Sequence, residues 1–224
     1  MTELSKEASA ARIAKNVAAL VNGTDRPYVM NLGVGIPTQV SNYIENENVY
    51  IQAENGMLGV GPIAEGEQIH PQLINAGRQP VCQTDGCVFL DSVESFAMIR
   101  GGHVDATVLG AFQVDEQANV ANWTIPGGKQ LGVGGAMDLV SGAETVIIAM
   151  THTNRGRLKL VKECTLPITG RGEADLIVTE LAVFRFENGG WVLKKLAPDV
   201  TREELAAVTG FRYTEAADVA AMEV

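Results

Sequence analysis

The amino-acid sequence predicts a three-layer α/β fold, an open and mainly parallel sheet with helices on both faces. Strand-like and helix-like patterns alternate along most of the 224 residues. Two strand-like runs, 103–114 and 145–152, are strongly apolar, as strands covered on both faces of a sheet tend to be. Adjacent β-rich runs nearer the C-terminal end predict a possible antiparallel pair at the sheet edge. With no linker or low-complexity tract, residues 1–224 are expected to form a single domain.

The N-terminal quarter is predicted to contain a helix, a strand, a second helix and a second strand. Apolar residues recur with helical spacing across 5–21, and Gly23 is suited to end that helix. The run 28–35 has the pattern of a buried strand that leads into a glycine turn. Pro37 suits the first turn of the next helix because its φ angle is fixed. Residues 49–56 are then expected to form a strand.

The middle of the chain continues this alternation. A third strand is expected within 81–90, with a bend at Gly86. Residues 91–102 have the pattern of a helix that Asp91 or Ser92 caps and a glycine pair ends. The two apolar strands described above follow this helix.

The C-terminal part is predicted to contain a hairpin and a last helix. Residues 174–196 are two β-rich runs around Asn188-Gly189-Gly190, which is a hairpin signal. Thr201 and Glu204 have the spacing of a capping box. They predict a helix near 202–209.

The composition disfavours several classes of function. The formal net charge is −10 and the isoelectric point is about 4.8, which argues against a nucleic-acid surface and against docking to an anionic membrane. No apolar run approaches the ~20 residues of a transmembrane helix, and the charged N-terminal segment lacks the apolar core of a signal peptide. We therefore expect a cytoplasmic protein. Its three cysteines are expected to be reduced, and no Cys or His set has metal-ligand spacing.

Glycine clusters stand at or near the ends of predicted strands, at 33–35, 56–61 and 132–135. In an open α/β sheet, ligands bind outside the carboxyl ends of the strands, and glycines there let backbone N–H groups approach a ligand closely. Glu54, in the stretch QAENGMLGVGP (52–62), would stand at the edge of such a cradle. Two interpretations remain open for this residue. It is either a solvated residue of an Asn-Gly turn, which composition alone favours, or a carboxylate that reacts as a nucleophile.

The stretch QAENGMLGVGP resembles the S-E-N-G signature of class I coenzyme A transferases, specifically the B (β) subunit of the acetoacetate, butyrate and 3-oxoacid type. Two positions depart from the family pattern, since Ala53 replaces the usual Ser and Arg78 stands where many members have Lys. The likeness covers nearly the whole chain in the family's order, in the segments NLGVGIPT (31–38), LINAGRQP (73–80), SFAMIRGGHVDATVLGAFQV (95–114), ANWTIPG (121–127), GVGGAMDLVSGA (132–143), CTLPITG (164–170) and TELAVFRF (179–186).

The resemblance implies the coenzyme A transferase fold and a ping-pong reaction that moves coenzyme A from a short-chain acyl-CoA to a carboxylic acid. Glu54 is the implied nucleophile and forms a glutamyl-CoA thioester. Gly135 and the 33–35 loop are the expected oxyanion donors. No permanently bound cofactor or metal is needed, and coenzyme A and acyl-CoA are substrates. The residues expected to contact coenzyme A are Gly33, Val34, Gly35, Asn55, Gly56, Arg78 and Gly134.

The resemblance also implies a partner, because the family's complete enzyme has two homologous halves and this chain matches the half that carries the glutamate. We expect the partner to be the A (α) type of CoA-transferase chain, joined in a heterodimer or heterotetramer with the active site between the two chains. The alternatives are a self-sufficient homo-oligomer, an acyl-CoA hydrolase that uses the same glutamate, and a coenzyme A-binding regulatory module. For Arg78, a surface salt bridge is the alternative to a contact with coenzyme A phosphates.

Overall fold

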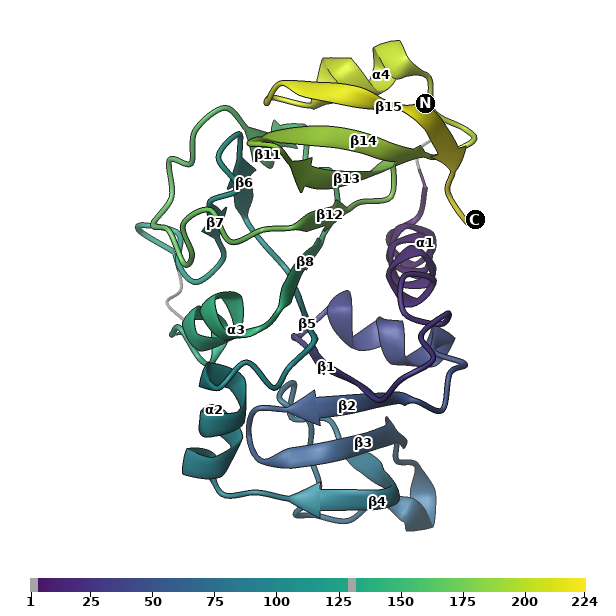
Figure 1. Cartoon of the computed structure of the whole chain (residues 1–224), viewed down its shortest axis with the longest axis vertical. Coiled ribbons are helices and arrows are strands. Elements are labelled where there is room, and N and C mark those ends of the chain that lie inside the picture. Colours follow the sequence, from purple (N-terminus) through teal and green to yellow (C-terminus); the bar gives the residue numbers. More distant parts are fainter. Residues whose placement is uncertain (1–3, 129–131) are drawn as a thin grey trace.

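The computed structural model describes residues 4–128 and 132–224 and is built on one large sheet (Figure 1). The strands of this sheet are β1 (Tyr28–Leu32), β2 (Val49–Ala53), β3 (Met57–Ile63), β4 (Val81–Phe89), β5 (Ala106–Leu109), β8 (Thr145–Ala149), β12 (Leu176–Val178), β13 (Ala182–Glu187), β14 (Gly190–Leu196) and β15 (Tyr213–Ala221). Their order across the sheet is β15-β14-β13-β12-β8-β5-β1-β2-β3-β4.

The centre of the sheet is parallel, and the flanks are mixed. The strands β12, β8, β5, β1 and β2 all run in the same direction. On one side β3 and β4 are antiparallel, and on the other side β13 and β14 are antiparallel. The outermost strand, β15, runs parallel to β14. The predicted α/β class is confirmed, with antiparallel strands on both sides of the parallel centre.

Helices cover both faces of this sheet (Figure 1). Helix α1 (Lys6–Ala18) and the 3₁₀ helix η1 (Pro37–Tyr43) lie on one face, whereas α2 (Ser92–Arg100) and α3 (Ala136–Gly142) lie on the other. A short 3₁₀ turn, η2 (Gly66–Gln68), precedes β4, and α4 (Arg202–Val208) joins β14 to β15. Two small sheets complete the fold and consist of β6 (Gln113–Asp115), β7 (Val120–Ala121), β9 (Thr153–Asn154), β10 (Arg157–Leu158) and β11 (Leu160–Val161).

The sequence pattern explains how α1 packs. Ile13, Ala14 and Val17 are fully buried, as expected for residues three and four apart on one helix face. Ser5 caps the helix, because its side chain accepts a hydrogen bond from the Ala8 N–H at 3.1 Å. Burial of this apolar face against the sheet stabilises α1 far more than its helix propensity does.

Capping residues set the start of two other helices. Asp91 and Glu94 form a capping box at α2, and Thr201 and Glu204 form one at α4. In each box the two side chains satisfy backbone N–H groups that have no partner within the helix. The prediction of a capped helix is therefore confirmed at both places.

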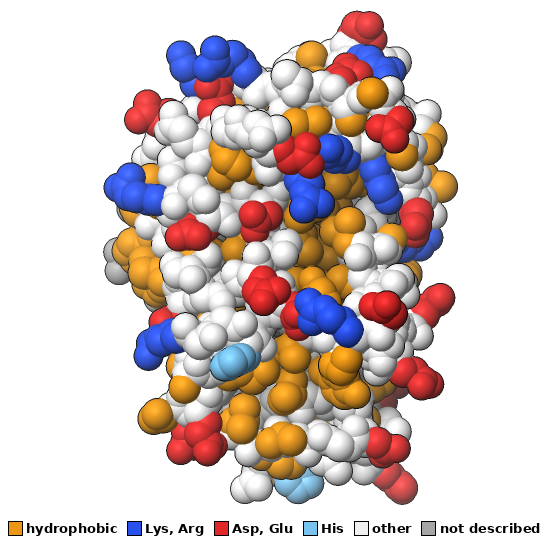
Figure 2. All heavy atoms as spheres, in the orientation of Figure 1, with side chains coloured by type: hydrophobic (Ala, Val, Ile, Leu, Met, Phe, Trp, Pro, Cys, Tyr) orange, Lys and Arg blue, Asp and Glu red, His pale blue; other side chains and the backbone are white. Residues whose placement is uncertain are grey.

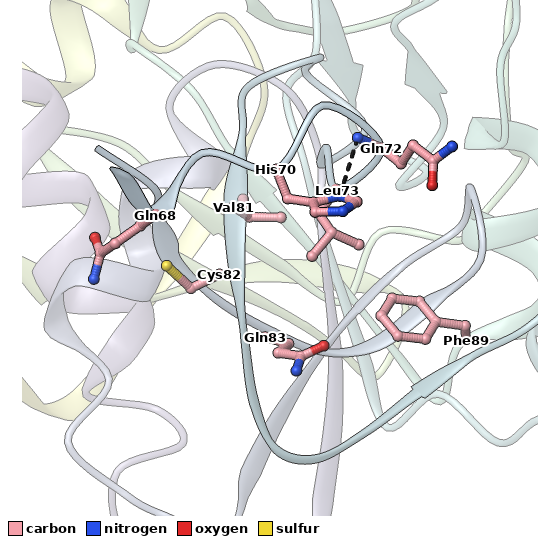
Figure 3. A pocket seen from close by; sticks show the side chains of 8 residues that line it. All are labelled: Gln68, His70, Gln72, Leu73, Val81, Cys82, Gln83 and Phe89. Atoms are coloured by element: carbon pink, nitrogen blue, oxygen red, sulfur yellow. Dashed lines mark hydrogen bonds between the residues drawn. The ribbon is translucent and has the colours of Figure 1, made fainter. Parts of the chain in front are cut away.

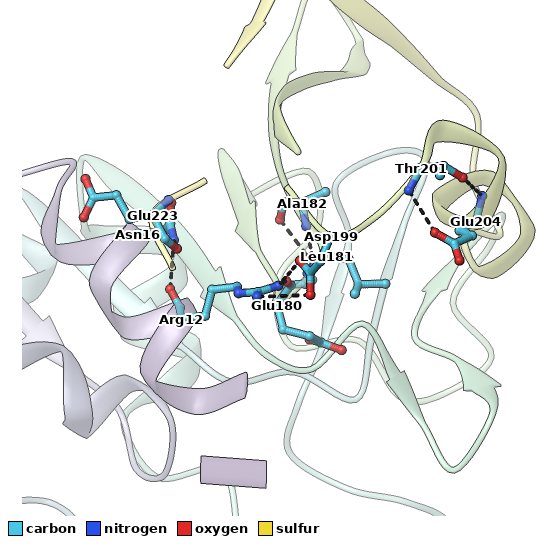
Figure 4. A network of polar contacts seen from close by, with 10 residues as sticks. Arg12, Asn16, Glu180, Leu181, Ala182, Asp199, Thr201, Glu204 and Glu223 are labelled. Atoms are coloured by element: carbon cyan, nitrogen blue, oxygen red, sulfur yellow. Dashed lines mark hydrogen bonds and ion pairs between the residues drawn. The ribbon is translucent and has the colours of Figure 1, made fainter. Parts of the chain in front are cut away.

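Polar contacts tie α1 to the C-terminal part of the chain (Figure 4). The Arg12 guanidinium donates to Asp199 at 2.8 Å and to the Glu180 carbonyl at 3.1 Å. Asn16 donates to the Glu223 carbonyl at 2.8 Å. The Arg12 hydrogen bonds also lower the pKa of Asp199. Because Arg12 is buried, this ion pair holds α1 in one position more firmly than a surface pair would.

The hairpin between β13 and β14 is also confirmed, although the first of the two runs expected over 174–196 is divided into β12 and β13. Asn188 and Gly189 have positive φ angles of 52° and 79°, which fits a two-residue turn with the twist that hairpins favour. Around it, Phe184 packs edge-on to Phe211 and Tyr213, and Trp191 stacks on Phe211 with ring centroids 5.5 Å apart. These rings form much of the core under the antiparallel strands.

Some predicted boundaries were wrong. The strand expected over 49–56 ends at Ala53, and the chain then turns back as β3, which was not predicted. The run 103–114 is divided into β5 and β6, because the chain leaves the sheet between Leu109 and Gln113. Pro37 does begin a helix, although of 3₁₀ type. Helix α3 and strand β15 were also missed.

Candidate active site

The carboxyl ends of the central strands lie at one rim of the sheet, because these strands run parallel. Glu54 follows β2, Gly33 follows β1 and Gly110 follows β5. Farther along the rim, His152 lies shortly after β8 and Glu180 shortly after β12. Ligands of open α/β sheets bind at such a rim, so the nucleophile expected from the sequence stands where a ligand can reach it.

Glu54 begins the tight turn that connects β2 to β3. The Gly56 N–H donates to the Ala53 carbonyl at 3.0 Å, and Gly56 has a φ angle of 119°, which L side chains rarely adopt. A Cβ at Gly56 would also collide with the backbone carbonyl of Leu90. Only glycine fits there, and the Asn55–Gly56 sequence therefore serves the turn.

Glu54 is half-buried, and protein groups hold its backbone more firmly than its carboxylate. The Ser95 hydroxyl donates to the Glu54 backbone carbonyl at 2.9 Å. The Asn31 amide lies 3.5 Å from Glu54 Oε2, which is at the limit of a hydrogen bond. The carboxylate is thus placed but only weakly bonded within the chain.

Gly135 lies directly against Glu54, although the two residues are 81 positions apart in the sequence. It precedes α3, and a Cβ built there would stand 3.0 Å from Glu54 Cγ and 3.4 Å from Phe96 Cζ. Its φ angle of −88° is open to any residue, so lack of space, and not backbone strain, disfavours a side chain at this position. The neighbouring Gly134 has a positive φ angle of 56°.

The 33–35 loop approaches the same rim from β1. The Gly33 N–H donates to the Val108 carbonyl at 2.9 Å, and a Cβ at Gly33 would lie 3.0 Å from that carbonyl. Gly35 has a φ angle of 96°. Val34 projects from the loop and is 65% exposed. The loop is therefore fixed to β5 at its base while its tip faces solvent.

The segment that carries Arg78 meets both of these regions. The Asn55 amide donates to the Ile74 carbonyl at 2.9 Å, and a Cβ at Gly77 would lie 3.8 Å from Val34 Cγ1. Arg78 itself is exposed and has a φ angle of 63°. Within the described part of the chain it makes no ion pair, so the surface salt bridge considered for it is not found.

Two hollows lie near this region. A small cavity of about 30 Å³ beneath the Glu54 turn is lined by residues that include Gln52, Ala53 and Asn75. A wider open groove of about 670 Å³ runs along β4 (Figure 3). It is lined by Gln68, His70, Gln72, Leu73, Val81, Cys82, Gln83 and Phe89. Glutamine side chains and hydrophobic groups share this groove, and no cluster of charge marks it as a catalytic site.

The rest of the rim carries a second set of ionisable groups. His152 is fully buried, and its two ring nitrogens lie 3.0 Å from Thr179 Oγ1 and 3.1 Å from Thr209 Oγ1. Burial lowers the pKa of His152 to about 3. Burial also lowers the pKa of Lys159 to about 8 and raises the pKa of Glu180. The His152 ring is closed to a ligand, whereas Lys159 and Glu180 are half-buried beside it.

Across residues 4–128 and 132–224, no group of three or more His, Cys, Asp or Glu side chains is arranged to hold a metal ion. The three cysteines are free thiols. Within the same ranges, no helix has both the length and the apolar character that crossing a membrane requires.

Sequence reasoning missed the residues that surround Glu54, namely Asn31, Gln52, Ser95 and Phe96. A signal for two of them was present, because Asn31 and Gln52 are polar residues inside otherwise apolar strands. Such residues are buried at a cost unless they are hydrogen-bonded. Nothing in the sequence alone distinguished Ser95 and Phe96 from the other residues of α2.

Comparison with known proteins identifies the class to which this fold and site belong. The family model described as "Coenzyme A transferase" matches residues 11–207. The chain therefore belongs to the coenzyme A transferase family and is a transferase subunit of the B type.

Two bacterial relatives match over nearly their whole length. The chain is 47% identical over 210 residues to the beta subunit of acetate CoA-transferase from Escherichia coli K12, covering 93% of this chain and 94% of that protein. It is 44% identical over 202 residues to the B subunit of a probable succinyl-CoA:3-ketoacid coenzyme A transferase from Bacillus subtilis, covering 89% and 92%. The rat mitochondrial succinyl-CoA:3-ketoacid coenzyme A transferase 2A is 46% identical over 187 residues, which are 82% of this chain and 36% of the rat protein.

Solved structures share the fold. The acyl-CoA transferase YdiF of Escherichia coli O157:H7, in a thioester complex with CoA, superposes with a TM-score of 0.77 at 21% identity. The match covers 99% of this chain and 44% of that one, so the chain spans less than half of that polypeptide. Glutaconate coenzyme A-transferase of Acidaminococcus fermentans has a TM-score of 0.69 at 19% identity, covering 99% and 90%.

Proposed function

We propose that this chain supplies the nucleophile of a short-chain acyl-CoA:carboxylate CoA transferase of the acetate, butyrate, acetoacetate or 3-oxoacid type. The observation that carries the proposal is the placement of Glu54, a half-buried carboxylate at the carboxyl rim with Gly135 directly against it. The similarity to chains named for acetate and for succinyl-CoA:3-ketoacid transfer supports this substrate class.

In the proposed reaction Glu54 attacks the thioester carbonyl of an acyl-CoA. The C–S bond breaks, and an acyl-glutamyl anhydride and CoA thiolate result. The thiolate attacks the glutamyl carbonyl of the anhydride, which releases the carboxylate of the donor acid and leaves a glutamyl-CoA thioester. An acceptor carboxylate then runs both steps in reverse and leaves as the new acyl-CoA, with Glu54 restored. The thioester energy is retained throughout, so the proposal requires no ATP.

Each attack creates a negatively charged oxygen, and fixed donors would stabilise it. One backbone N–H aimed at such an oxygen contributes about 3 kcal/mol in other oxyanion holes. The proposed donors are Gly135, which is in contact with Glu54, and the 33–35 loop. Gly135 packs against one side of Glu54, and the acyl group and the thioester are proposed to reach the carboxylate from its solvent-accessible side.

Coenzyme A itself would lie across the rim toward the segment of Arg78. The hydrogen bond from Asn55 to the Ile74 carbonyl joins this segment to the Glu54 turn, and Gly77 lies close to Val34 of the 33–35 loop. An exposed guanidinium without an ion pair in the described chain is suited to a phosphate of the nucleotide. We propose no permanently bound cofactor, since coenzyme A enters and leaves as part of the substrate.

We also propose a partner of the A type, in a heterodimer or heterotetramer. Relatives of similar length are named as beta or B chains of a transferase, and the rat relative, of which this chain covers 36%, has a much longer polypeptide. Hydrophobic side chains gather over β2, β3 and β4 on the face shown in Figure 2. Phe89 and Val93 are 56% and 74% exposed. An apolar surface beside the site is suited to an obligate interface.

The test is to trap the covalent intermediate. The chain is co-expressed with a partner of the A type, incubated with acetyl-CoA or acetoacetyl-CoA in the absence of an acceptor acid, and treated with borohydride, which reduces a thioester. Mass spectrometry is expected to find the reduced side chain at Glu54 and at no other carboxylate. An acceptor screen ranked by kcat/KM then identifies the acid.

Three results would contradict the proposal. An unmodified Glu54 in a complex that turns over acyl-CoA would exclude the covalent route. Release of free coenzyme A at the same rate with and without an acceptor would indicate a hydrolase. Full transferase activity of this chain alone would exclude the need for a partner.

A further inference from the structure

A row of buried polar side chains crosses the centre of the sheet below Glu54. Gln52 on β2, Asn31 on β1 and Thr107 on β5 are register partners of one another. Their exposed fractions are 1%, 0% and 0%. Register partners on neighbouring parallel strands point to the same face of the sheet, so these side chains form one polar line among apolar neighbours. Such groups destabilise a core unless they are hydrogen-bonded.

Two members of this row connect to Glu54 through Ser95. Asn31 Nδ2 donates to Gln52 Oε1 at 2.7 Å, and Gln52 Nε2 donates to Ser95 Oγ at 3.0 Å. Ser95 Oγ in turn donates to the Glu54 carbonyl at 2.9 Å. Asn31 Nδ2 also donates to the Gln52 backbone carbonyl at 3.1 Å and faces Glu54 Oε2 at 3.5 Å. An amide nitrogen carries two hydrogens, so the long contact with Glu54 shares a hydrogen with one of the two bonds to Gln52. The four residues therefore form a ring that holds the Glu54 backbone through Ser95 and brings the Asn31 amide next to the Glu54 carboxylate.

The chemistry of the groups fixes the direction of this ring. The Glu54 carbonyl can only accept, so the Ser95 hydroxyl must donate to it and can then only accept from Gln52. Gln52 donates through its amide nitrogen, which leaves its amide oxygen to accept from Asn31. The Asn31 side-chain nitrogen therefore faces both Gln52 and Glu54. The Asn31 side-chain oxygen, Oδ1, is buried without a partner in the described chain. Buried oxygens without a partner are uncommon, and a catalytic role is one of the explanations for them.

We propose that this ring aims the nucleophile, with Gln52 and Ser95 as positioning residues and Asn31 as the donor that meets the Glu54 carboxylate. The inference rests on the function proposed above. A donor on Oε2 leaves Oε1 as the attacking oxygen and fixes the rotation of the carboxylate. The 3.5 Å contact is long in the free chain, and such contacts tighten when charge develops during the reaction. In the steps where coenzyme A thiolate or an acid attacks the Glu54 carbon, negative charge develops on an oxygen of Glu54 itself, next to the Asn31 amide.

The main test removes the hydroxyl from Ser95 in the co-expressed pair. Ser95→Ala is expected to lower kcat by about 10- to 100-fold, which is the loss that a misplacement of about 1 Å causes. The KM for acetyl-CoA is expected to stay within about twofold, because the hydroxyl does not reach the substrate. Gln52→Met keeps the length of the side chain and breaks the ring at its middle, so it should show the same pattern. Ser95→Thr restores a hydroxyl and is expected to recover most of the lost kcat.

Ser9→Ala is the matched control, since Ser9 is a buried serine on a helix with no contact to Glu54. It is expected to leave kcat and KM unchanged. Thermal unfolding of each variant separates a loss of activity from a loss of folded protein. If Ser95→Ala and Gln52→Met keep kcat within about twofold of the wild type, or lose activity only through KM, the positioning role is wrong.

A pH profile distinguishes aiming from general support of the fold. Asn31→Asp places a second carboxylate next to Glu54, and two adjacent carboxylates resist simultaneous ionisation. The acid limb of the kcat profile is therefore expected to move to higher pH in Asn31→Asp, whereas Asn31→Leu lowers kcat without moving the limb. An equal loss at every pH in both variants would contradict a contact between Asn31 and the reacting carboxylate. If instead the wild-type pair transfers no coenzyme A and Glu54 is never labelled, the proposed function itself fails.

Discussion

Two places along the same rim of the sheet carry ionisable side chains, and they differ in how completely the protein satisfies them. After β2, the Glu54 carboxylate is half-buried and has one hydrogen bond at 3.5 Å. After β8, the His152 ring is fully buried, and both of its nitrogens have threonine partners within 3.1 Å. A group with free hydrogen-bonding capacity and access to solvent can react, whereas a sealed and saturated group can only support the fold.

The residues around the two places explain this difference. Gly56 allows the tight turn after Glu54, and the lack of a side chain at Gly135 lets the chain pack directly against the Glu54 side chain. At the other place, Thr179 after β12 and Thr209 after α4 contact the two nitrogens of the His152 ring, and Glu180 accepts a hydrogen bond from the His152 backbone N–H at 2.9 Å. Position at the carboxyl rim is therefore not enough to identify a reactive group. The hydrogen bonds and the access of each side chain decide its role.

The largest expected effect comes from removing the reactive carboxylate. Glu54→Ala should lower kcat by about a thousandfold or more, because no other group takes over a covalent step. Glu54→Asp should also lower kcat steeply, because its carboxylate is one methylene farther from the substrate. Glu180→Gln is the matched change at the saturated end of the rim and should keep kcat near the wild-type value. Steady-state assays of the co-expressed pairs measure all three. A Glu54→Ala enzyme with more than a tenth of wild-type kcat would contradict the assignment.

A side chain at Gly135 should have the next largest effect. Gly135→Val places methyl groups where a Cβ alone would already lie 3.0 Å from Glu54 Cγ. We expect kcat to fall by about 100-fold with little change in affinity for coenzyme A, because the donor acts mainly in the transition state. Gly23→Ala is a suitable control, since a Cβ at Gly23 meets nothing within 4 Å. Equal losses in kcat and in coenzyme A affinity, the latter measured by calorimetry, would indicate that the valine simply blocks the pocket.

The saturated end of the rim should govern stability at acidic pH. Burial lowers the pKa of His152 from 6.5 to about 3, so the unfolded chain binds this proton more tightly than the folded chain does. The stability that the neutral ring contributes is fully present above pH 6.5 and is lost as the pH falls toward 3. Between about pH 6.5 and pH 5 the free energy of unfolding should drop by about 2 kcal/mol from this residue.

Denaturant unfolding at several pH values measures this dependence. His152→Gln cannot bind the proton, so its free energy of unfolding should change less over the same pH range than that of the wild type. His103→Gln, at an exposed position, should keep the wild-type slope. If the free energy of unfolding of His152→Gln changes with pH as much as that of the wild type, other groups cause the acid sensitivity.

Much of the fold was predictable from the sequence because local chemistry and tertiary structure agree there. The helix that contains Ile13 and Val17, the capping boxes at Asp91 and Thr201, and the turn at Asn188 each have a local physical cause. The return of the chain as β3 was not predictable in the same way. The stretch MLGVGPI is rich in glycine and contains a proline, so its strand state depends on pairing with β2 and β4.

The residues of the candidate site also fall into two groups, those that the sequence could predict and those that it could not. Glu54, Gly135 and Arg78 could be named from the sequence because they lie in motifs of the family. Such motifs identify positions in the sequence, but they do not specify the contacts around them. The ring of Asn31, Gln52 and Ser95 depends on the register between β1 and β2 and on the packing of α2, which no local pattern specifies. Asn31 and Gln52 could be noticed as polar residues in apolar strands, but long-range register is the physical reason that their contacts around Glu54 could not be predicted from the sequence.

The smallest expected effect tests how far the open part of the rim extends. Arg78 and Arg155 make a matched pair, since both are exposed arginines with positive φ angles, 63° and 50°, and neither has an ion pair in the described chain. Alanine at either position keeps the backbone strain and removes only the cation. If Arg78 binds a phosphate of coenzyme A, Arg78→Ala should raise the KM for acyl-CoA by about 10-fold, a loss typical of one charge-assisted contact.

Arg155→Ala lies outside the proposed site and should leave the KM unchanged. Arg78→Lys, which restores the residue found in many family members, should recover most of the affinity because a phosphate accepts an ammonium as a point charge. The KM of Arg78→Ala should also depend less on salt than that of the wild type, since a screened charge pair has been removed. Equal KM values in Arg78→Ala and Arg155→Ala would confine the open part of the rim to Glu54, Gly135 and the 33–35 loop, and would place the coenzyme A nucleotide on the partner.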